Sequence, residues 1–170
     1  MEQFIIFALS NFTLTLFILS VLFAALALTL KSKLKRADVI DVLFSYFLLF
    51  NVGISYLYNF VMHVFLGDMA AQFIGWAQSP FQLEVGFASL GFAVIGIISF
   101  WSKLGFRAAT VIAPAMFLWG AAGGHIYQMI VATNYAPGNA GIILGTDIFM
   151  PILGFILLWL QYKNPPVSAR

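Results

Sequence analysis

The sequence predicts an all-α fold: a polytopic membrane helical bundle with five transmembrane helices and a short outer interfacial helix, in a single domain of residues 1–170. Three observations predict this class. Of the 170 residues, 62% are hydrophobic and only 8% are charged, whereas soluble domains carry about 25% charged residues. Five apolar segments each approach the roughly 20 residues that cross a bilayer core as a helix. The basic residues alternate between loops, as a membrane topology requires.

The five apolar segments cover about residues 4–30, 42–66, 81–101, 108–132 and 141–162. The first has an alternative reading as a secretory signal peptide, because Ala25-Leu26-Ala27 resembles a cleavage site. However, no basic residue precedes this run, and it is longer than the roughly 7–15 residues of a signal-peptide core. The basic residues within 31–36 then act as a stop-transfer signal, so we expect a true span.

Basic residues predict the orientation, because cytoplasmic loops carry an excess of Lys and Arg. The first loop, the third loop and the C-terminal tail contain all eight basic residues: Lys31, Lys33, Lys35, Arg36, Lys103, Arg107, Lys163 and Arg170. In a five-span topology these residues share one side of the bilayer. We therefore expect an integral membrane protein with its N-terminus outside and its C-terminus cytoplasmic.

The two outer loops contain structure of their own. Residues 67–79 read GDMAAQFIGWAQS, with Asp68 as a candidate N-cap and apolar residues on one face at helical spacing. We expect a short helix lying in the outer interface and stopped by Ser79-Pro80. In the fourth loop, Pro137-Gly138 favours a tight turn.

Small residues mark the helix faces that pack closely in membranes. The third span carries two such stripes on different sides, so we expect it to pack on both sides and to be central. One stripe is Gly86, Ser89, Ala93 and Gly96, and the other is Glu84, Ala88 and Gly91. In the fourth span, Gly120 and Gly124 form a GxxxG pattern that is typical of helix packing.

The second span carries the clearest polar pattern. Its polar residues recur at intervals of four: Asn51, Ser55, Asn59 and His63. At about 100° per residue, this stripe winds slowly around the helix. Asparagine in hydrocarbon requires a hydrogen-bond partner, so the stripe should face protein or water and not lipid.

Four spans place an ionisable residue in one layer, roughly 5–10 Å below the outer boundary at about 1.5 Å of rise per residue. The four are His63, Glu84, His125 and Asp147. Other polar residues are expected close to them, and the binding candidates among these are Asn59, Gln82, Gln128 and Asn139. Intramembrane ionisable residues indicate a functional site. We expect Glu84 to pair with His125, and Asp147 to pair with either histidine.

Each of the four has a structural alternative. Asp147 could cap the fifth helix, since Thr146-Asp147 is typical N-cap chemistry. Glu84 lies in a first helical turn, where the helix dipole favours a carboxylate. The two histidines could serve the membrane interface and the packing of the bundle.

Three functional classes fit these features. The first is ion or small-solute handling, transport-like or channel-like, at the polar site under the outer face. The second is a membrane redox protein that binds haem through His63 and His125, or a divalent metal through His63, Glu84, His125 and Asp147. The third is a structural or accessory subunit of a membrane complex, which would assemble as a homo-oligomer or with a partner membrane subunit.

Several classes are disfavoured. The chain has no cysteine, which excludes disulfides and thiolate chemistry. Its basic residues form one short run, so nucleic acid is not an expected partner, and the lipid bilayer is. No dense catalytic motif indicates an enzyme.

Two stretches resemble a family of small bacterial polytopic integral membrane proteins of uncharacterised function. They are residues 76–86, WAQSPFQLEVG, and residues 134–141, NYAPGNAG, which lead to Asp147. The resemblance covers roughly Asn51 to Leu160. It implies a polytopic protein of a bacterial inner membrane and brings no activity, substrate or cofactor with it.

Overall fold

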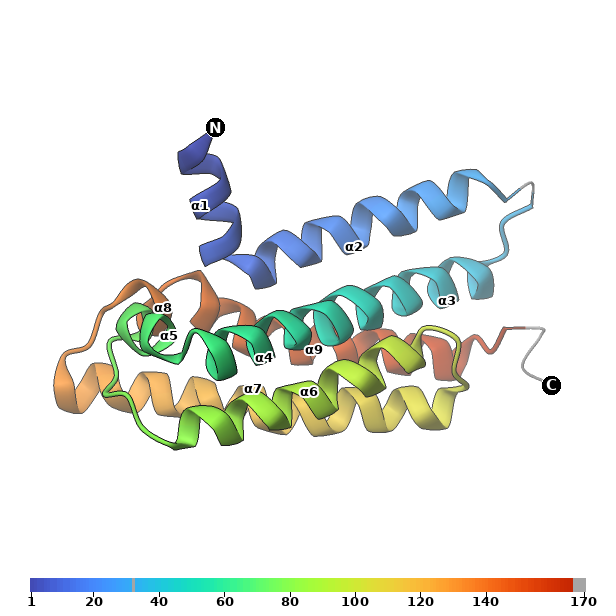
Figure 1. The fold of residues 1–170 in the computed structure, drawn as a ribbon. Coiled ribbons are helices and arrows are strands. Elements are labelled where there is room, and N and C mark those ends of the chain that lie inside the picture. Colours follow the sequence, from blue (N-terminus) through green and yellow to red (C-terminus); the bar gives the residue numbers. More distant parts are fainter. Residues whose placement is uncertain (32, 167–170) are drawn as a thin grey trace.

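Five helices that are long and apolar enough to cross a membrane run side by side in the computed structural model, which describes residues 1–31 and 33–166 (Figure 1). The first is α2 (Phe12–Thr29). The second is one continuous helix made of α3 (Arg36–Phe47), the π-helix η1 (Leu48–Ile54) and α4 (Ser55–Phe65). The other three are α6 (Phe81–Ser99), α7 (Leu104–Ala132) and α9 (Ile142–Lys163). Three shorter helices complete the chain: α1 (Glu2–Ser10), α5 (Gly67–Ile74) and α8 (Pro137–Ala140). The described residues form no strand, and the predicted all-α class is confirmed.

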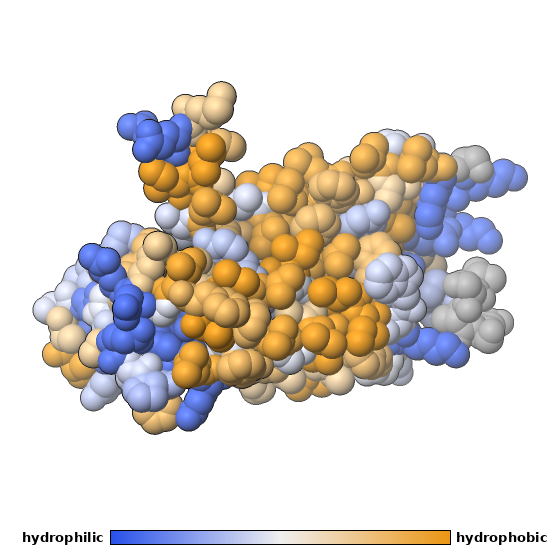
Figure 2. Space-filling view, in the orientation of Figure 1, coloured by the Kyte–Doolittle hydropathy of each residue, from blue (hydrophilic) through white to orange (hydrophobic). Residues whose placement is uncertain are grey.

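The hydropathy of the surface changes along the long axis of the bundle (Figure 2). Apolar residues cover the middle of the bundle, and polar residues gather at its two ends (Figure 2). One end, which we call the basic end, holds Lys31, Lys33, Lys35 and Lys103 together with Lys163 at the end of α9. The other end, which we call the α5 end, holds α5 and α8 (Figure 1). An apolar belt between two polar ends is the surface of an integral membrane protein. Arg170 lies outside the described residues.

The first span is shorter than predicted, because the helix breaks at Asn11. The backbone of Asn11 leaves the helical region, with φ −117° and ψ 43°. Its side-chain amide donates to the carbonyl of Phe7, which also accepts from the backbone N–H of Asn11, and the Thr15 hydroxyl donates to the carbonyl of Ala8. The span therefore begins at Phe12, and α1 turns away from the bundle axis (Figure 1).

The core lies in the middle of the bundle, on the side of the basic end. Buried aromatic and aliphatic side chains from α3, η1, α7 and α9 fill it, among them Phe44, Phe47, Leu48, Val52, Val111 and Leu157. Phe44 and Leu48 are fully buried. This cluster closes the bundle between its two ends.

Helix α6 packs on one side only. Gly86, Ser89, Ala93 and Gly96 are all buried, as the first small stripe predicted. The second stripe, with Glu84, Ala88 and Gly91, is exposed, so the expected packing on both sides is wrong. The buried face approaches η1 closely, and a Cβ at Gly96 would overlap the backbone of Gly53.

The loop after α4 contains the expected short helix, but this helix ends earlier than predicted. Helix α5 stops at Gly75, which adopts the left-handed conformation with φ 75°, and not at Ser79-Pro80. Glycine suits this position because it lacks the Cβ that penalises positive φ. Asp68 does not cap the helix through its side chain; it accepts a hydrogen bond from Gln78 at 2.8 Å.

Candidate functional site

A cavity of about 1060 Å³ occupies the half of the bundle next to the α5 end. Eight helices contribute to its wall: α1, α2, α4, α5, α6, α7, α8 and α9, together with residues of η1. Most of the wall is apolar. The polar side chains that line it include Thr13, Asn51, Ser55, Tyr56, Tyr58, Asn59, His63, Gln82, His125, Thr146 and Asp147.

His125 is held by a network centred on Asn139. The Asn139 side chain is fully buried in α8, and its amide nitrogen donates to the backbone carbonyls of His125 and Asn134, at 3.1 and 2.9 Å. Its amide oxygen faces the Trp76 indole nitrogen at 3.0 Å and the His125 Nδ1 atom at 2.8 Å. The imidazole is thus fixed in orientation by α8 and the segment after α5.

Asp147 faces the other side of the same imidazole. Its Oδ2 atom lies 3.8 Å from His125 Nε2, and the aspartate is only 4% exposed. Among the described residues, no hydrogen bond joins its carboxylate to a side chain or to the backbone. The helix begins at Ile142, five residues earlier in the chain, with Gly141 as its N-cap, so Asp147 is not the capping residue. The expected Asp147–histidine pair therefore forms with His125.

The stripe of the second span contributes two further polar contacts to the wall. His63 Nδ1 forms a hydrogen bond with the Gln82 side-chain oxygen, which joins α4 to α6. The Asn59 amide donates to the Ser89 hydroxyl at 2.9 Å. As predicted, this stripe faces protein and the cavity, and these residues remain available to a ligand.

Glu84 does not belong to this site, and its predicted pairing with His125 is wrong. The side chain is exposed on the surface of α6 and does not line the cavity. The reason is rotational: Gln82 faces the cavity, and two further residues turn the helix by about 200°. Glu84 is therefore a carboxylate of the first turn, where the helix dipole stabilises it.

Two other predicted ligands, Gln128 and Asn139, also do not line the cavity. Asn139 holds His125 from behind. In the described part of the chain, no three His, Asp or Glu side chains gather in a group that could hold a metal ion. The proposed metal set of His63, Glu84, His125 and Asp147 is thus not brought together. His63 and His125 do line the same cavity.

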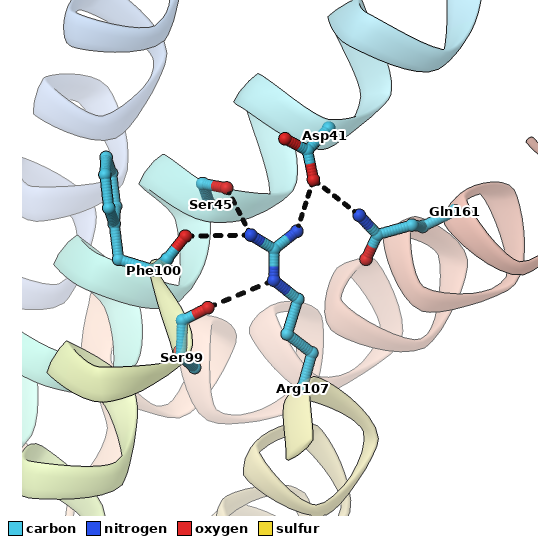
Figure 3. Close-up of polar contacts among 6 residues, drawn as sticks. All are labelled: Asp41, Ser45, Ser99, Phe100, Arg107 and Gln161. Carbon is cyan, nitrogen blue, oxygen red and sulfur yellow. Dashed lines mark hydrogen bonds and ion pairs between the residues drawn. The ribbon is translucent and has the colours of Figure 1, made fainter. Parts of the chain in front are cut away.

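A second polar cluster, at the basic end, was not anticipated from the sequence (Figure 3). Arg107 was expected in a loop, but it lies in the first turn of α7 and is 3% exposed. Its guanidinium donates to Asp41 at 2.8 Å and to the Ser45 hydroxyl at 2.6 Å, both on α3. It also donates to the carbonyls of Ser99 and Phe100, at 3.0 and 2.8 Å.

The fourth helix of this cluster is α9. The Gln161 amide donates to Asp41 at 2.7 Å, so a single carboxylate oxygen accepts from both Gln161 and Arg107. The guanidinium also lies 5.5 Å from the centre of the Phe44 ring. Asp41 and Arg107 lie 66 positions apart in the chain, and the signal in the sequence was an acidic residue directly before the second apolar segment.

The family comparison matches almost the whole chain. The model of a family of unknown function, DUF6790, covers residues 10–167. The chain belongs to this family. The match is longer than the Asn51 to Leu160 resemblance and takes in the first span as well. Comparisons with curated proteins and with solved structures found no match. This DUF6790 member is thus an integral membrane protein whose site must be interpreted from its own geometry.

Proposed function

We propose that this DUF6790 protein binds a small, largely apolar molecule with a polar head in the intramembrane cavity. The observation that carries the proposal is the cavity itself: about 1060 Å³, with an apolar wall and a few convergent polar groups. Ligand sites in proteins are typically clefts of about 300–1,000 Å³ with this character. The proposal refines the small-solute handling that the sequence predicts.

The polar groups support a ligand more than a packing role. A buried polar group that only stabilises the bundle should have its hydrogen bonds satisfied by the protein. The Asp147 carboxylate lacks such a bond within the described residues, and it lines the cavity beside His125. The wall therefore retains hydrogen-bonding capacity at the point where the ligand's head would lie.

Transport would require a second conformation of the bundle, with a route from the cavity to the basic end. The apolar cluster around Phe44, Leu48 and Val52 fills the bundle between the cavity and the basic end. A route across the bundle would need the helices to move, so binding is the function that this geometry supports best. We propose that the α5 end faces outward and the basic end faces the cytoplasm, because Lys31, Lys103 and Lys163 gather there.

The test is to fill the cavity. Ala121 on α7 lines the cavity, and Ala121→Phe places an aromatic ring in the space. The matched control is Ala109→Phe on the same helix, at an exposed position outside the cavity. Calorimetric titration with dodecanol, dodecylamine and dodecanoate, with empty micelles as the blank, should show saturable binding of at least one compound to the parent and to Ala109→Phe.

Binding by Ala121→Phe should fall by about tenfold or more, because the ring occupies the ligand's volume. If the parent and Ala121→Phe bind all three compounds equally, the cavity is not a binding site. The absorption spectrum of the purified protein is recorded in parallel. A Soret band would favour the haem alternative, since His63 and His125 both line the cavity.

A further inference from the structure

We infer that Asp147 and His125 form a subsite for a protonated amine, so that the ligand is an amphipathic amine. This inference rests on the proposed function and names the chemical class of its ligand. Two independent observations point to it: the hydrogen-bond pattern that places a proton on Nδ1 of His125, and the charge balance of the cavity wall.

The first observation concerns the imidazole. Asn139 donates both of its amide contacts to backbone carbonyls, of His125 and of Asn134, so its Oδ1 atom must be the end that faces the ring. An amide oxygen only accepts hydrogen bonds. The Nδ1 atom of His125 must therefore carry the proton, and a neutral ring presents an unprotonated Nε2 to the cavity.

That nitrogen faces a second acceptor. His125 Nε2 and Asp147 Oδ2 are 3.8 Å apart, which is beyond the range of a direct hydrogen bond. The Asp147 carboxylate forms no hydrogen bond among the described residues, although it is only 4% exposed. Two neighbouring acceptors without a donor between them favour a ligand group that can donate two hydrogen bonds at once.

The second observation is the charge of the wall. Within the described part of the chain, Asp147 is the only carboxylate that lines the cavity, and no Lys or Arg lines it. Arg107, the buried cation of the bundle, lies in the separate cluster at the basic end and already binds Asp41. A buried carboxyl group in an apolar wall stays ionised only beside a compensating cation. The cavity is therefore matched to a positively charged ligand and not to an anionic one.

A protonated amine satisfies both observations. A primary ammonium has three N–H donors, so it can bridge Nε2 and Oδ2 while its charge is balanced by Asp147. An alcohol has one donor and no charge, and a quaternary ammonium has the charge without a donor. The alkyl chain would lie along the apolar remainder of the wall, which includes Phe73, Met116 and Ile143.

The test compares three head groups on one alkyl chain: dodecylamine, dodecanol and dodecyltrimethylammonium, titrated calorimetrically into the full-length protein in neutral detergent. We expect dodecylamine to bind about tenfold or more tightly than the other two, as charge-assisted hydrogen bonds typically provide. Asp147→Asn should remove this preference, because it keeps the shape of the side chain and loses its charge. Glu84→Gln, the same change on the exposed face of α6, should leave the preference intact.

The outcomes separate the two proposals. If dodecanol binds as tightly as dodecylamine, or if Asp147→Asn keeps the preference, the amine subsite is refuted while the binding cavity stands. If dodecyltrimethylammonium equals dodecylamine, the bridging of two acceptors is refuted. If neither these three compounds nor dodecanoate bind to the parent protein, both proposals fail. Should Asp147→Asn fail to fold, His125→Gln provides the second variant, and it should also lower the preference for the amine.

Discussion

Asn139 shows how much a single side chain can organise in a membrane protein. It is fully buried and joins four polar groups: two backbone carbonyls, the Trp76 indole and the His125 imidazole. Sequence analysis placed Asn139 near the site as a possible ligand. Its role in the structure is to orient His125, because both ends of its amide are already used by the protein.

Replacing Asn139 with alanine should therefore destabilise the fold. The substitution leaves the Trp76 and His125 donors unpaired in a buried place, at a cost of about 1–3 kcal/mol for each such group. We expect a clear fall in the midpoint of thermal unfolding of the detergent-solubilised protein. Gln72→Ala, at an exposed amide on α5, is the control and should leave the midpoint unchanged. Equal midpoints for the two variants would contradict the role of Asn139.

At the scale of elements, the closest packing joins η1 to α6. Gly53 and Gly96 face each other with no space for a Cβ at Gly96, so the two backbones are in contact. Such close approach is how helices associate in lipid, where hydrophobic burial between helices adds little. The contact also places Asn51 and Ser55, on the neighbouring turns of the second span, at the cavity.

Gly96→Ala should separate these two elements. The added methyl group meets backbone atoms of Gly53, which cannot rotate away, so we expect a loss of about 1–3 kcal/mol of stability. The control lies five residues earlier: Gly91 has open space at its Cβ position, and Gly91→Ala should be neutral or slightly stabilising, since alanine favours a helix. Unfolding in increasing dodecyl sulfate measures both. A Gly96→Ala protein as stable as Gly91→Ala would show that the contact is not tight.

At the scale of the whole molecule, the Arg107 cluster ties four of the five bundle helices at the basic end (Figure 3). The cavity lies in the other half, and the apolar core lies between them. One half is thus fastened by the polar contacts around Arg107, and the other half keeps polar groups for a ligand.

Arg107→Lys should weaken this fastening while keeping the charge. An ammonium cannot reproduce the planar fork that contacts Asp41, Ser45 and two carbonyls, so we expect a destabilisation of about 2–3 kcal/mol. Arg36→Lys makes the same change at an exposed position at the start of α3 and should have no effect. The free energy of unfolding of both variants is measured by chemical denaturation. If Arg107→Lys is as stable as Arg36→Lys, the cluster needs only the positive charge of Arg107.

The proposed orientation predicts a labelling pattern. Because the chain has no cysteine, single cysteines report one position each. In intact cells, a membrane-impermeant maleimide should label Gln78→Cys at the α5 end and should not label Lys103→Cys at the basic end until the membrane is permeabilised. The reverse pattern would invert the topology, and labelling of both in intact cells would refute the segregation of the two ends.

The elements were largely predictable, whereas the site was predictable only in part. His63, Asn59, Gln82, His125 and Asp147 do line one cavity, because depth along a helix follows from counting residues. Glu84 lies at the same depth in the bundle as these residues, but its side chain points away from the cavity. It follows Gln82 by two residues, and two residues turn a helix by about 200°. Depth can be counted from the sequence, but direction around the helix axis depends on which neighbour the helix packs against.

The sequence by itself determined that this is an all-α membrane protein with five long apolar helices and one basic end, because length, apolarity and charge are local properties of the chain. Small residues at helical spacing marked two faces of α6, and only the face with Gly86, Ser89, Ala93 and Gly96 is packed in the structure. The tertiary structure alone decided that α1 breaks away at Asn11, that Arg107 binds Asp41, and that Asp147 meets His125 beside Asn139. These features depend on how distant helices rotate and pack against one another, which no local pattern specifies.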